Sequence, residues 1–451
     1  MVVEGWLARA AATRPAQLAL DTPAGSWSYA ELLRQARAGA QELSARGVAP
    51  GESVAIALPG GLDFAQALHA CLLLGAVAVP VDMRLTARER APLAARAALL
   101  VDQPLGRASA RSGGAGGAEA AHDLDAVAVQ LHTSGTSAAP RAVELTYGNF
   151  LWSALGSAVA LELDPRERWL CALPVSHVGG LSILLRSAMY GTTAVVHERF
   201  ETDRVLHALR MQQITLVSLV ATTLARLLDA GLRRPATLRC ALTGGGPVPA
   251  ALRERAQAEG VPASLTYGLT EACSQVTTTP QGLLARDGPV PGPPLFCVRA
   301  RIAGVAQGGG EEGEILVAGP TVAPRARAGD GWLHTGDVGS LDEHGRLHVG
   351  GRLADTIISG GENVAPAEVE AVLESHPDVL EAAVIGREHA SWGQSVTAIV
   401  VAREGQAPAG EELRAHCALA LAPYKVPRAV ELRSAPLPRT RSGKLQRRKL
   451  S

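Results

Sequence analysis

The chain has 451 residues, of which 47% are hydrophobic and 19% charged, a composition typical of globular proteins that argues against intrinsic disorder as the main state. Its 43 Lys and Arg residues balance 43 Asp and Glu residues, so no basic excess favours general nucleic-acid binding. The longest apolar run, from Cys71 to Val81, is broken by Pro80 and falls short of the ~20 residues that a membrane helix needs. The six cysteines are scattered without a CxxC pair. We therefore expect a cytoplasmic protein in a reducing compartment, without a membrane span, zinc ribbon or disulfide scaffold.

The first half of the chain alternates between helical and extended patterns. Residues 28–47 have helical spacing and end at a glycine, residues 53–58 are typical of a buried strand, and 63–76 and 77–81 repeat this order. Strand patterns return at 126–132, and residues 215–231 contain a strand followed by a helix. Strands that alternate with helices predict a parallel α/β sheet.

The pattern changes after residue 285. Four prolines between 289 and 294 come first, and strand patterns at 297–304, 313–319 and 346–351 follow, with a hairpin turn near 343–345. A smaller unit with helices at 366–376 and 411–421 and strands at 381–386 and 395–402 completes the chain. We therefore predict two domains, residues 1–353 and 354–451.

A loop rich in hydroxyl groups follows the strand at 126–132. Such a loop can cradle phosphate oxygens through its hydroxyl and backbone N–H groups, although it lacks the GxxxxGK[ST] pattern of a P-loop. Taken alone, this loop is weak evidence for phosphate binding, and an ordinary turn is the simpler interpretation. The residues in question are Thr133, Ser134, Gly135, Thr136 and Ser137.

Further motifs suggest a nucleotide site. Three glycines end the strand pattern LTGGG at 242–246, where backbone can approach a flat ligand closely. Thr270 and Glu271 pair a hydroxyl with a carboxylate, a combination that suits Mg²⁺ beside nucleotide phosphates. Asp337, in GWLHTGD, can accept hydrogen bonds from ribose hydroxyls. Lys444 is one of only three lysines among 43 basic residues, as expected where a slender point charge is required.

In this order, the motifs resemble those of the ANL superfamily of adenylate-forming enzymes, which includes acyl-CoA synthetases, adenylation domains and luciferases. The resemblance covers nearly the whole chain and includes GEILVAGP at 313–320. Within the superfamily, residues 173–191 and 267–278 are most similar to the family of o-succinylbenzoate–CoA ligases of menaquinone biosynthesis.

The resemblance implies an α/β multidomain fold. A large N-terminal domain would hold two αβ subdomains and a distorted β-barrel, and a small mobile C-terminal α+β domain would carry the catalytic lysine. It also implies two half-reactions with ATP, Mg²⁺ and CoA: a carboxylate and ATP give acyl-AMP and pyrophosphate, and the CoA thiol then displaces AMP. The partners would be small molecules, and a homodimer is left open.

The resemblance assigns roles to individual residues. Catalysis would depend on Lys444, on Glu271 as the Mg²⁺ ligand, and on His177, which would also close the acyl pocket. Nucleotide binding would involve the 133–137 loop together with Arg141, Gly244, Gly245, Gly246, Tyr267, Gly268, Thr270, Asp337 and Arg352. The acyl group would meet His177, Arg186, Ser274 and Gln275, and CoA would pass Ser359, Gly360 and Gly361.

These acyl-pocket roles compete with plainer ones. His177 could be a structural histidine, Arg186 could lie on a solvated helix face, and Ser274 and Gln275 could be ordinary loop residues.

The sequence departs from the superfamily's usual pattern at three positions. Ala138 stands where glycine is usual in the phosphate loop, and Arg141 stands where lysine is usual. Ala354 stands at the hinge position, where aspartate is common, and Asp355 follows it. The sequence therefore does not show which residue acts as the pivot.

Several alternatives keep the same motifs. The acid could be another aryl or acyl acid, or the acceptor could be a carrier protein instead of CoA. A luciferase-like oxygenase shares the adenylating motifs, and a catalytically dead nucleotide-binding protein would be expected to have lost Glu271, Asp337, Arg352 or Lys444. A nicotinamide enzyme is disfavoured because no GxGxxG follows a strand.

Overall fold

The structure is a computed structural model of the 451-residue chain. It describes residues 1–85, 87–108, 121–133, 141–305, 310–355, 357–359, 362–389, 393–421, 423–439 and 445–450. The chain forms two compact units, which are treated separately below. The first is Met1–Gly245 with Ala256–Ala300 and Val317–Leu333, and the second is Gly246–Arg255 with Arg301–Leu316 and His334–Ser451.

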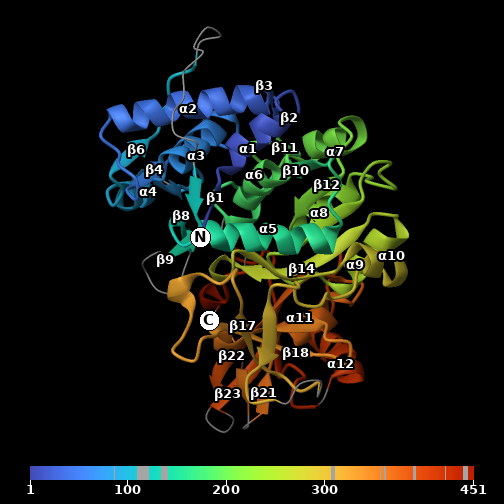
Figure 1. The fold of residues 1–451 in the computed structure, drawn as a ribbon. Helices are drawn as coiled ribbons and strands as arrows, with labels where there is room; N and C mark the ends of the chain where they lie inside the picture. The colour runs from blue at the N-terminus through green and yellow to red at the C-terminus, as the bar shows by residue number, and fades with distance from the viewer. Residues whose placement is uncertain are drawn as a thin grey trace. The chain divides into compact units, whose positions relative to one another are not determined.

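The first unit contains a mostly parallel sheet near the N-terminus (Figure 1). Within the described ranges it has five strands, in spatial order β6 (Leu99–Val101), β4 (Ser53–Ile56), β5 (Val77–Pro80), β8 (Val127–Thr133) and β9 (Arg141–Thr146). The first four strands are parallel, and β9 returns antiparallel to β8. The predicted strands at 53–58, 77–81 and 126–132 are therefore present.

A second sheet of the same unit has eight strands among the described residues. Their spatial order is β15 (Ser274–Thr278), β14 (Ala263–Leu269), β13 (Cys240–Thr243), β12 (Leu216–Leu219), β10 (Arg168–Cys171), β11 (Thr193–Val196), β2 (Leu18–Thr22) and β3 (Gly25–Ser28). The six central strands are parallel, and β15 and β3 are antiparallel edge strands. A short pair, β1 (Val2–Glu4) with β7 (Ala121–Asp123), lies apart from both sheets.

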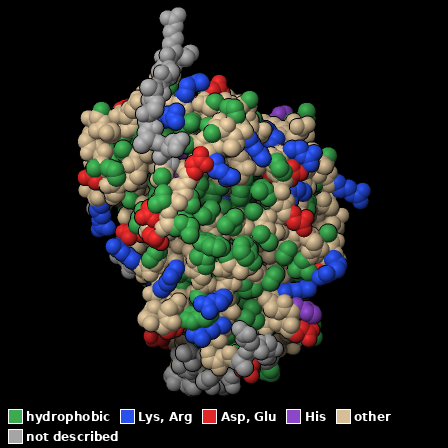
Figure 2. All heavy atoms as spheres, in the orientation of Figure 1, with side chains coloured by type: hydrophobic (Ala, Val, Ile, Leu, Met, Phe, Trp, Pro, Cys, Tyr) green, Lys and Arg blue, Asp and Glu red, His purple; other side chains and the backbone are tan. Residues whose placement is uncertain are grey.

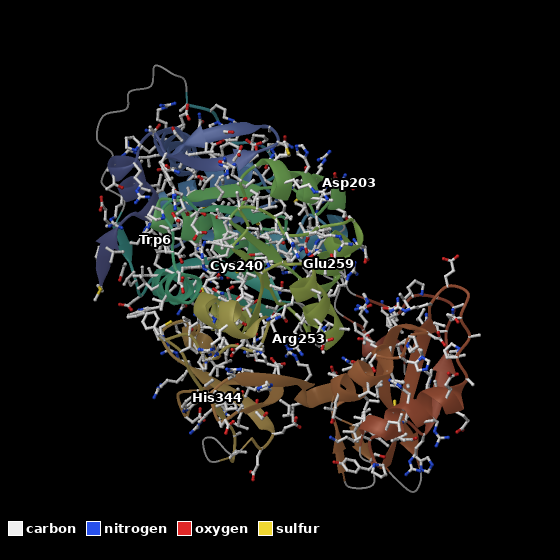
Figure 3. All side chains as sticks on the ribbon, turned by 90° about the vertical axis from the view of Figure 1, so that its right-hand side faces the viewer. Trp6, Asp203, Cys240, Arg253, Glu259 and His344 are labelled. Atoms are coloured by element: carbon white, nitrogen blue, oxygen red, sulfur yellow. The ribbon has the colours of Figure 1, made fainter. Side chains whose placement is uncertain are left out.

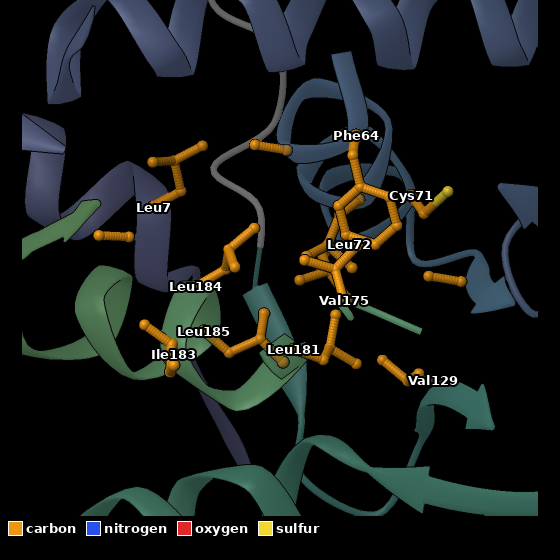
Figure 4. Close-up of a cluster of buried hydrophobic side chains, with 14 of the residues drawn as sticks. Leu7, Phe64, Cys71, Leu72, Val129, Val175, Leu181, Ile183, Leu184 and Leu185 are labelled. Carbon is orange, nitrogen blue, oxygen red and sulfur yellow. The ribbon is translucent and has the colours of Figure 1, made fainter. Parts of the chain in front are cut away.

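Helices of the first unit connect the parallel strands. They are α1 (Trp6–Thr13), α2 (Tyr29–Ala45), α3 (Leu62–Leu74), α4 (Ala87–Ala94), α5 (Tyr147–Leu161), α6 (Val178–Tyr190), α7 (Thr202–Met211), α8 (Ala221–Asp229) and α10 (Gln281–Asp287). Helix α9 (Ala250–Ala258) follows β13 and lies mostly within the second unit. One hydrophobic core joins both sheets, and Figure 4 shows Phe64 and Leu72 of α3 near Leu181 of α6 and Val129 of β8.

Local sequence signals explain where the longer helices begin and end. Ser28 and Glu31 form a reciprocal capping box at the start of α2, and Thr146 and Asn149 form another at the start of α5. Gly75 ends α3 in the left-handed conformation that glycine adopts without steric cost. The predicted helix at 28–47 therefore forms between its N-terminal capping box and the glycine that follows its last turn.

The second unit contains two further sheets. Among the described residues, the first has the order β16 (Arg299–Ile302), β17 (Gly313–Ala318), β18 (Leu333–Leu341) and β19 (Leu347–Arg352), and most of its residues belong to this unit. The second has the order β21 (Glu362–Val364), β20 (Ile357–Ser359), β23 (Gly393–Ala402) and β22 (Val379–His389), with β24 (Ala429–Leu432) also paired to β23. Helices α11 (Pro366–Glu374) and α12 (Gly410–Ala420) contribute Val369 and Leu413 to its core.

The predicted fold class is confirmed. Two αβ sheets form the large N-terminal part, the β16–β19 sheet follows where the resemblance implies the distorted barrel, and a small α+β part completes the chain. The domain boundary at 353/354 stays a prediction. None of the helices in the described residues is long and apolar enough to cross a membrane.

The cysteines are unpaired and are mainly packing residues. Cys240 lies in β13 inside the first unit, where Figure 3 places it among the strands, and burial raises the pKa of its thiol to about 12. Burial likewise raises the pKa of Cys71 and Cys171 to about 12. These thiols are therefore protonated at neutral pH and contribute no nucleophile.

Candidate active site

The motifs of the first unit lie where parallel strands end. The 134–140 loop follows β8, Gly244 follows β13, the Thr270–Ala272 turn (η1) follows β14, and His177 follows β10. Ligands of open α/β sheets bind beside the carboxyl ends of the strands. The topology therefore brings motifs that are far apart in sequence to the carboxyl edges of two neighbouring sheets.

The phosphate-loop motif is described only at its two ends. Thr133 and Arg141 lie opposite each other in the β8–β9 ladder, and Thr133 Oγ1 donates to the Arg141 carbonyl oxygen at 3.4 Å. The hydroxyl and glycine positions Ser134, Gly135, Thr136 and Ser137 lie outside the described residues, as does Ala138. The pairing fixes where the loop leaves and rejoins the sheet.

Each of the three glycines after β13 has a different environment. A Cβ at Gly244 would overlap the Thr266 carbonyl oxygen and approach Thr266 Cγ2 to 2.6 Å. Gly245 has φ +77°, in the left-handed region. A Cβ at Gly246 would meet no described atom within 4 Å. Close backbone packing therefore explains Gly244, and backbone conformation explains Gly245.

Tyr267 and Gly268 lie at an irregularity in the β14–β15 ladder. Register shifts between these two residues, so that Gly268 faces Gln275. A Cβ at Gly268 would overlap the Ser274 carbonyl oxygen and lie 2.6 Å from its carbon. Only glycine fits here, and this close approach sets the position of the turn that carries Thr270 and Glu271.

That turn is conformationally unusual. Thr270 and Glu271 form a short 3-10 helix, and the next two residues, Cys273 and Ser274, have φ +53° and +90°. Left-handed conformations are costly for residues other than glycine, so tertiary contacts must maintain them. The Glu271 carbonyl oxygen accepts from the Ala323 N–H at 2.8 Å, which is one such contact.

Arg186 supplies another contact to this turn. Its Nη2 donates to Ser153 Oγ at 2.9 Å, and Ser153 Oγ donates to the Cys273 carbonyl oxygen at 2.6 Å. The guanidinium lies 5.7 Å from the Trp169 ring centroid. Because Arg186 is only 3% exposed, the solvated-helix alternative is wrong for this residue. Burial lowers its pKa, and no carboxylate of the described residues pairs with it.

Gln275 is also buried beside the turn, with 1% exposure. Its Nε2 donates to Thr278 Oγ1 at 2.9 Å, whereas Oε1 has no partner among the described atoms. A buried amide oxygen without a partner is costly and marks a place where a ligand or water can donate.

His177 lies directly before α6 and contacts a charged pair. Its Nε2 is 2.7 Å from Arg84 Nη2 and 3.7 Å from Asp82 Oδ2. Arg84 Nε and Nη2 donate to Asp82 oxygens at 2.9 and 2.7 Å. Burial, followed by the Arg84 charge, lowers the pKa of His177, while Asp82 acts in the opposite direction. His177 is therefore neutral at physiological pH.

The Asp82–Arg84 pair lies after β5, at the carboxyl edge of the first sheet. Burial acts to raise the pKa of Asp82, but hydrogen bonds from Arg84 outweigh it and lower this pKa. The sequence analysis missed both residues, because their contact with His177 joins two sheets and spans 93 positions. Their only local signal is the Asp-x-Arg spacing.

In the second unit, Asp337 and Arg352 face each other across the β18–β19 ladder. Arg352 Nε lies 2.6 Å from Asp337 Oδ1, and Asp337 is only 6% exposed. The Asp337 N–H donates to Thr335 Oγ1 at 3.0 Å. Ser359 is buried at the end of β20, whereas Gly360, Gly361 and Lys444 lie outside the described residues.

Comparison with known proteins identifies the family. The model of the AMP-binding enzyme family matches residues 7–101 and 92–325, and the model of the AMP-binding enzyme C-terminal domain matches residues 368–444. This chain belongs to the AMP-binding enzyme family.

Similarity to individual members extends from end to end. The 2-succinylbenzoate–CoA ligase of Bacillus subtilis is 38% identical over 474 residues, which cover 99% of this chain and 97% of that protein. The solved structure of o-succinylbenzoate CoA synthetase (MenE) from Bacillus subtilis with its acyl-adenylate intermediate OSB-AMP has a TM-score of 0.90 at 36% identity, with 100% and 98% of the two chains covered. The structure of that enzyme with ATP and a magnesium ion has a TM-score of 0.89 at 36% identity and covers both chains fully.

Proposed function

We propose that the chain is an ATP-dependent acid–thiol ligase that joins o-succinylbenzoate to CoA. The observation that carries the proposal is the end-to-end similarity to 2-succinylbenzoate–CoA ligases. The positions of Gly244, Glu271 and His177 at the carboxyl edge of one sheet agree with it. The product would serve menaquinone biosynthesis, as the resemblance of residues 173–191 and 267–278 to the ligases of that pathway implies.

In the first half-reaction, a carboxylate oxygen of the acid attacks the α-phosphorus of ATP, and pyrophosphate leaves. Both reactants are anionic, so the protein's task is to position them and to neutralise charge. We assign the β,γ-phosphates to the 133–137 loop and Arg141, adenine to Gly244–Gly246 and Tyr267, and ribose to Asp337. Arg352, which holds the Asp337 carboxylate, would orient it toward the ribose hydroxyls.

The side chains of Thr270 and Glu271 are suitable ligands for Mg²⁺. They place a hydroxyl and a carboxylate on one short turn, and Mg²⁺ prefers oxygen ligands and usually keeps phosphate and water ligands as well. The ion would neutralise phosphate charge during adenylation. The carbonyl bond of Glu271 to Ala323 N–H fixes the backbone from which this carboxylate projects.

Recognition of the acid is assigned to the turn after β14 and to His177. Arg186 is a buried cation to which the described residues supply no carboxylate, and a water donating to the buried Gln275 Oε1, which has no described partner, could bridge it to the acid. A buried unpaired cation is costly, so an anionic ligand nearby would be stabilised. The second carboxylate of succinylbenzoate would supply this negative charge.

In the second half-reaction, the CoA sulfur attacks the acyl carbonyl carbon, and AMP leaves. The pantetheine arm of CoA would pass beside Ser359, Gly360 and Gly361. Domain 354–451 would rotate between the half-reactions, which would remove Lys444 from the active site and bring this loop to it.

A cytoplasmic location is also part of the proposal, because ATP and CoA are cytoplasmic cosubstrates.

A homodimer remains part of the proposal as well. Figure 2 shows hydrophobic side chains gathered over α5, and Trp152, Leu155 and Val159 of that helix are exposed. Exposed apolar patches often mark interfaces. Light scattering on the purified protein measures its mass directly, and the mass of a single chain would remove this part of the proposal.

The activity is tested by mass spectrometry. Purified protein, Mg·ATP and CoA are mixed with o-succinylbenzoate and, in parallel, with benzoate, cinnamate and medium-chain fatty acids. We expect succinylbenzoyl-CoA and AMP with the first acid only. AMP formed with another acid would keep the reaction class and overturn the substrate, and AMP formed with none of the acids would overturn the proposal.

The role of Lys444 is tested by separating the half-reactions. Lys444→Ala should slow adenylation by about 100-fold or more, because a charge placed at the reacting phosphate contributes several kcal/mol. Thioester formation from supplied acyl-AMP should change little. Lys449→Ala, at an exposed position, is the matched control. Equal losses in both half-reactions would contradict the assignment.

A further inference from the structure

The Asp82–Arg84 pair has a local geometry that recurs elsewhere in the chain. Arg84 donates to Asp82 through its backbone N–H at 2.9 Å and through Nε and Nη2. Arg166 binds Asp164 in the same way, with distances of 2.8, 3.1 and 2.8 Å. An aspartate two residues before an arginine therefore forms this bidentate pair on its own.

The two pairs differ in their surroundings. The Arg166 side chain is 89% exposed, and its pair belongs to a surface turn. The Arg84 side chain is 33% exposed, and its Nη2 reaches His177 Nε2 at 2.7 Å while it still donates to Asp82. Of these two bidentate pairs, the Asp82–Arg84 pair contacts His177. The Asp164–Arg166 pair therefore serves as an internal control.

The chemistry of the groups fixes the direction of this contact. A guanidinium has five N–H donors and no acceptor, and it stays protonated in proteins. The His177 Nε2 that faces Arg84 must therefore be the acceptor. A neutral imidazole with an unprotonated Nε2 carries its proton on Nδ1. Asp82 contributes by holding the guanidinium through two parallel hydrogen bonds, which restrict its orientation.

We infer that Asp82 and Arg84 are positioning residues for His177: they hold its ring before α6 in the tautomer with the proton on Nδ1. The ring then presents Nδ1–H as its single donor to an oxygen of the bound acid or acyl-adenylate. His177 is not held by its own helix, because its side chain makes no capping bond to α6. The inference rests on the proposed ligase activity for the role of His177, but the tautomer itself does not depend on that activity.

The tautomer is measured by NMR with ¹⁵N-labelled histidine in the intact protein. Two-bond ¹⁵N–¹H correlations distinguish protonated from unprotonated ring nitrogens, and the spectrum of His177→Asn assigns the signal. We expect an unprotonated Nε2 in the wild type and a mixture of tautomers in Arg84→Met. Arg166→Met should leave the signal unchanged. A protonated Nε2 in the wild type would overturn the inference.

A double-mutant cycle tests the functional link. Arg84→Met should lower kcat/KM for the acid by about tenfold, which corresponds to ~1.4 kcal/mol. Against a loss of about twofold without His177, this gives a coupling of ~1 kcal/mol, within the range for residues in contact. In a His177→Ala background the same change should cost less than about twofold, because the group it positions is gone. Thermal unfolding of each variant shows whether the fold is retained.

Two further variants separate charge from geometry. Arg84→Lys keeps the charge but lacks the fork that reaches Asp82 and His177 together, so it should recover only part of the activity. Asp82→Asn should weaken the orientation of Arg84 and also lower kcat/KM. An equal loss for Arg84→Met with and without His177 would overturn the positioning role. If wild-type protein shows no ligase activity, the proposed function fails, and the NMR result alone decides the Asp82–Arg84 inference.

Discussion

Alanine substitution at each of the three glycines after β13 should have a different cost. At Gly244, a Cβ would overlap the Thr266 carbonyl oxygen and lie 2.6 Å from Thr266 Cγ2, so the backbone of β14 must move. Overpacking of this kind costs about 1–3 kcal/mol, and we expect Gly244→Ala to lie at the upper end because a backbone atom is hit. It should also weaken ATP binding, since Tyr267 follows Thr266 directly.

The other two substitutions isolate the remaining effects. Gly245→Ala forces φ +77° on a residue with a Cβ, at a cost of about 1–2 kcal/mol. Gly246→Ala meets no described atom within 4 Å, so its effect on stability should stay within about 0.5 kcal/mol. A loss of ATP affinity in Gly246→Ala would therefore report contact with the nucleotide.

Urea unfolding followed by tryptophan fluorescence measures the loss of stability in each variant. Calorimetric titration with Mg·ATP measures the loss of ATP affinity. The expected order of destabilisation is Gly244, Gly245 and then Gly246. A Gly244→Ala protein as stable as the wild type would refute the steric reasoning. So would a Gly246→Ala protein as unstable as Gly244→Ala.

Two further predictions concern stability. Ser274→Gly should raise the unfolding midpoint by an amount equivalent to about 1 kcal/mol, because glycine adopts φ +90° freely, and a lower midpoint would contradict the strain argued for this turn. Burial lowers the pKa of His69 and His122 to about 4, below the ordinary value near 6.5, so the unfolded chain binds protons first as the pH falls. Stability should therefore drop between pH 6.5 and 4, by about 3 kcal/mol at most for each histidine, and His122→Gln should show a shallower drop in urea titrations at several pH values.

Much of the fold could be predicted because strand and helix periods alternate plainly along the chain. The predicted strand at 77–81 and helix at 28–47 form where their capping and apolar patterns indicate. The motif positions could also be anticipated, since glycine and hydroxyl clusters follow strand patterns. The sequence could not show that two separate sheets bring Arg84 to His177, because no local pattern encodes a contact across 93 positions.

Arg186 shows why burial is harder to predict. Helix α6 is buried on nearly all sides, including Ser182 and Arg186, so it lacks the polar face on which helical periodicity relies. For an arginine in such a helix, the sequence pattern is equally compatible with an exposed and with a buried side chain. Its partner Ser153 lies on α5, and Ser153 in turn donates to the carbonyl of Cys273, which lies after β14, so neither contact can be inferred from the α6 sequence alone.

The turn after β14 links the proposed metal and acid sites mechanically. Glu271 precedes the left-handed pair Cys273–Ser274, Ser274 is its second member, and Gln275 follows it. Three separate elements fix this turn: Gly268 through close packing, Ser153 through its bond to the Cys273 carbonyl, and Ala323 through its bond to the Glu271 carbonyl. Adenylation requires the carboxylate and the α-phosphate within reacting distance, and small misplacements are costly. One rigid turn that bore both proposed sets of ligands would keep their separation constant, which would account for the strained backbone there.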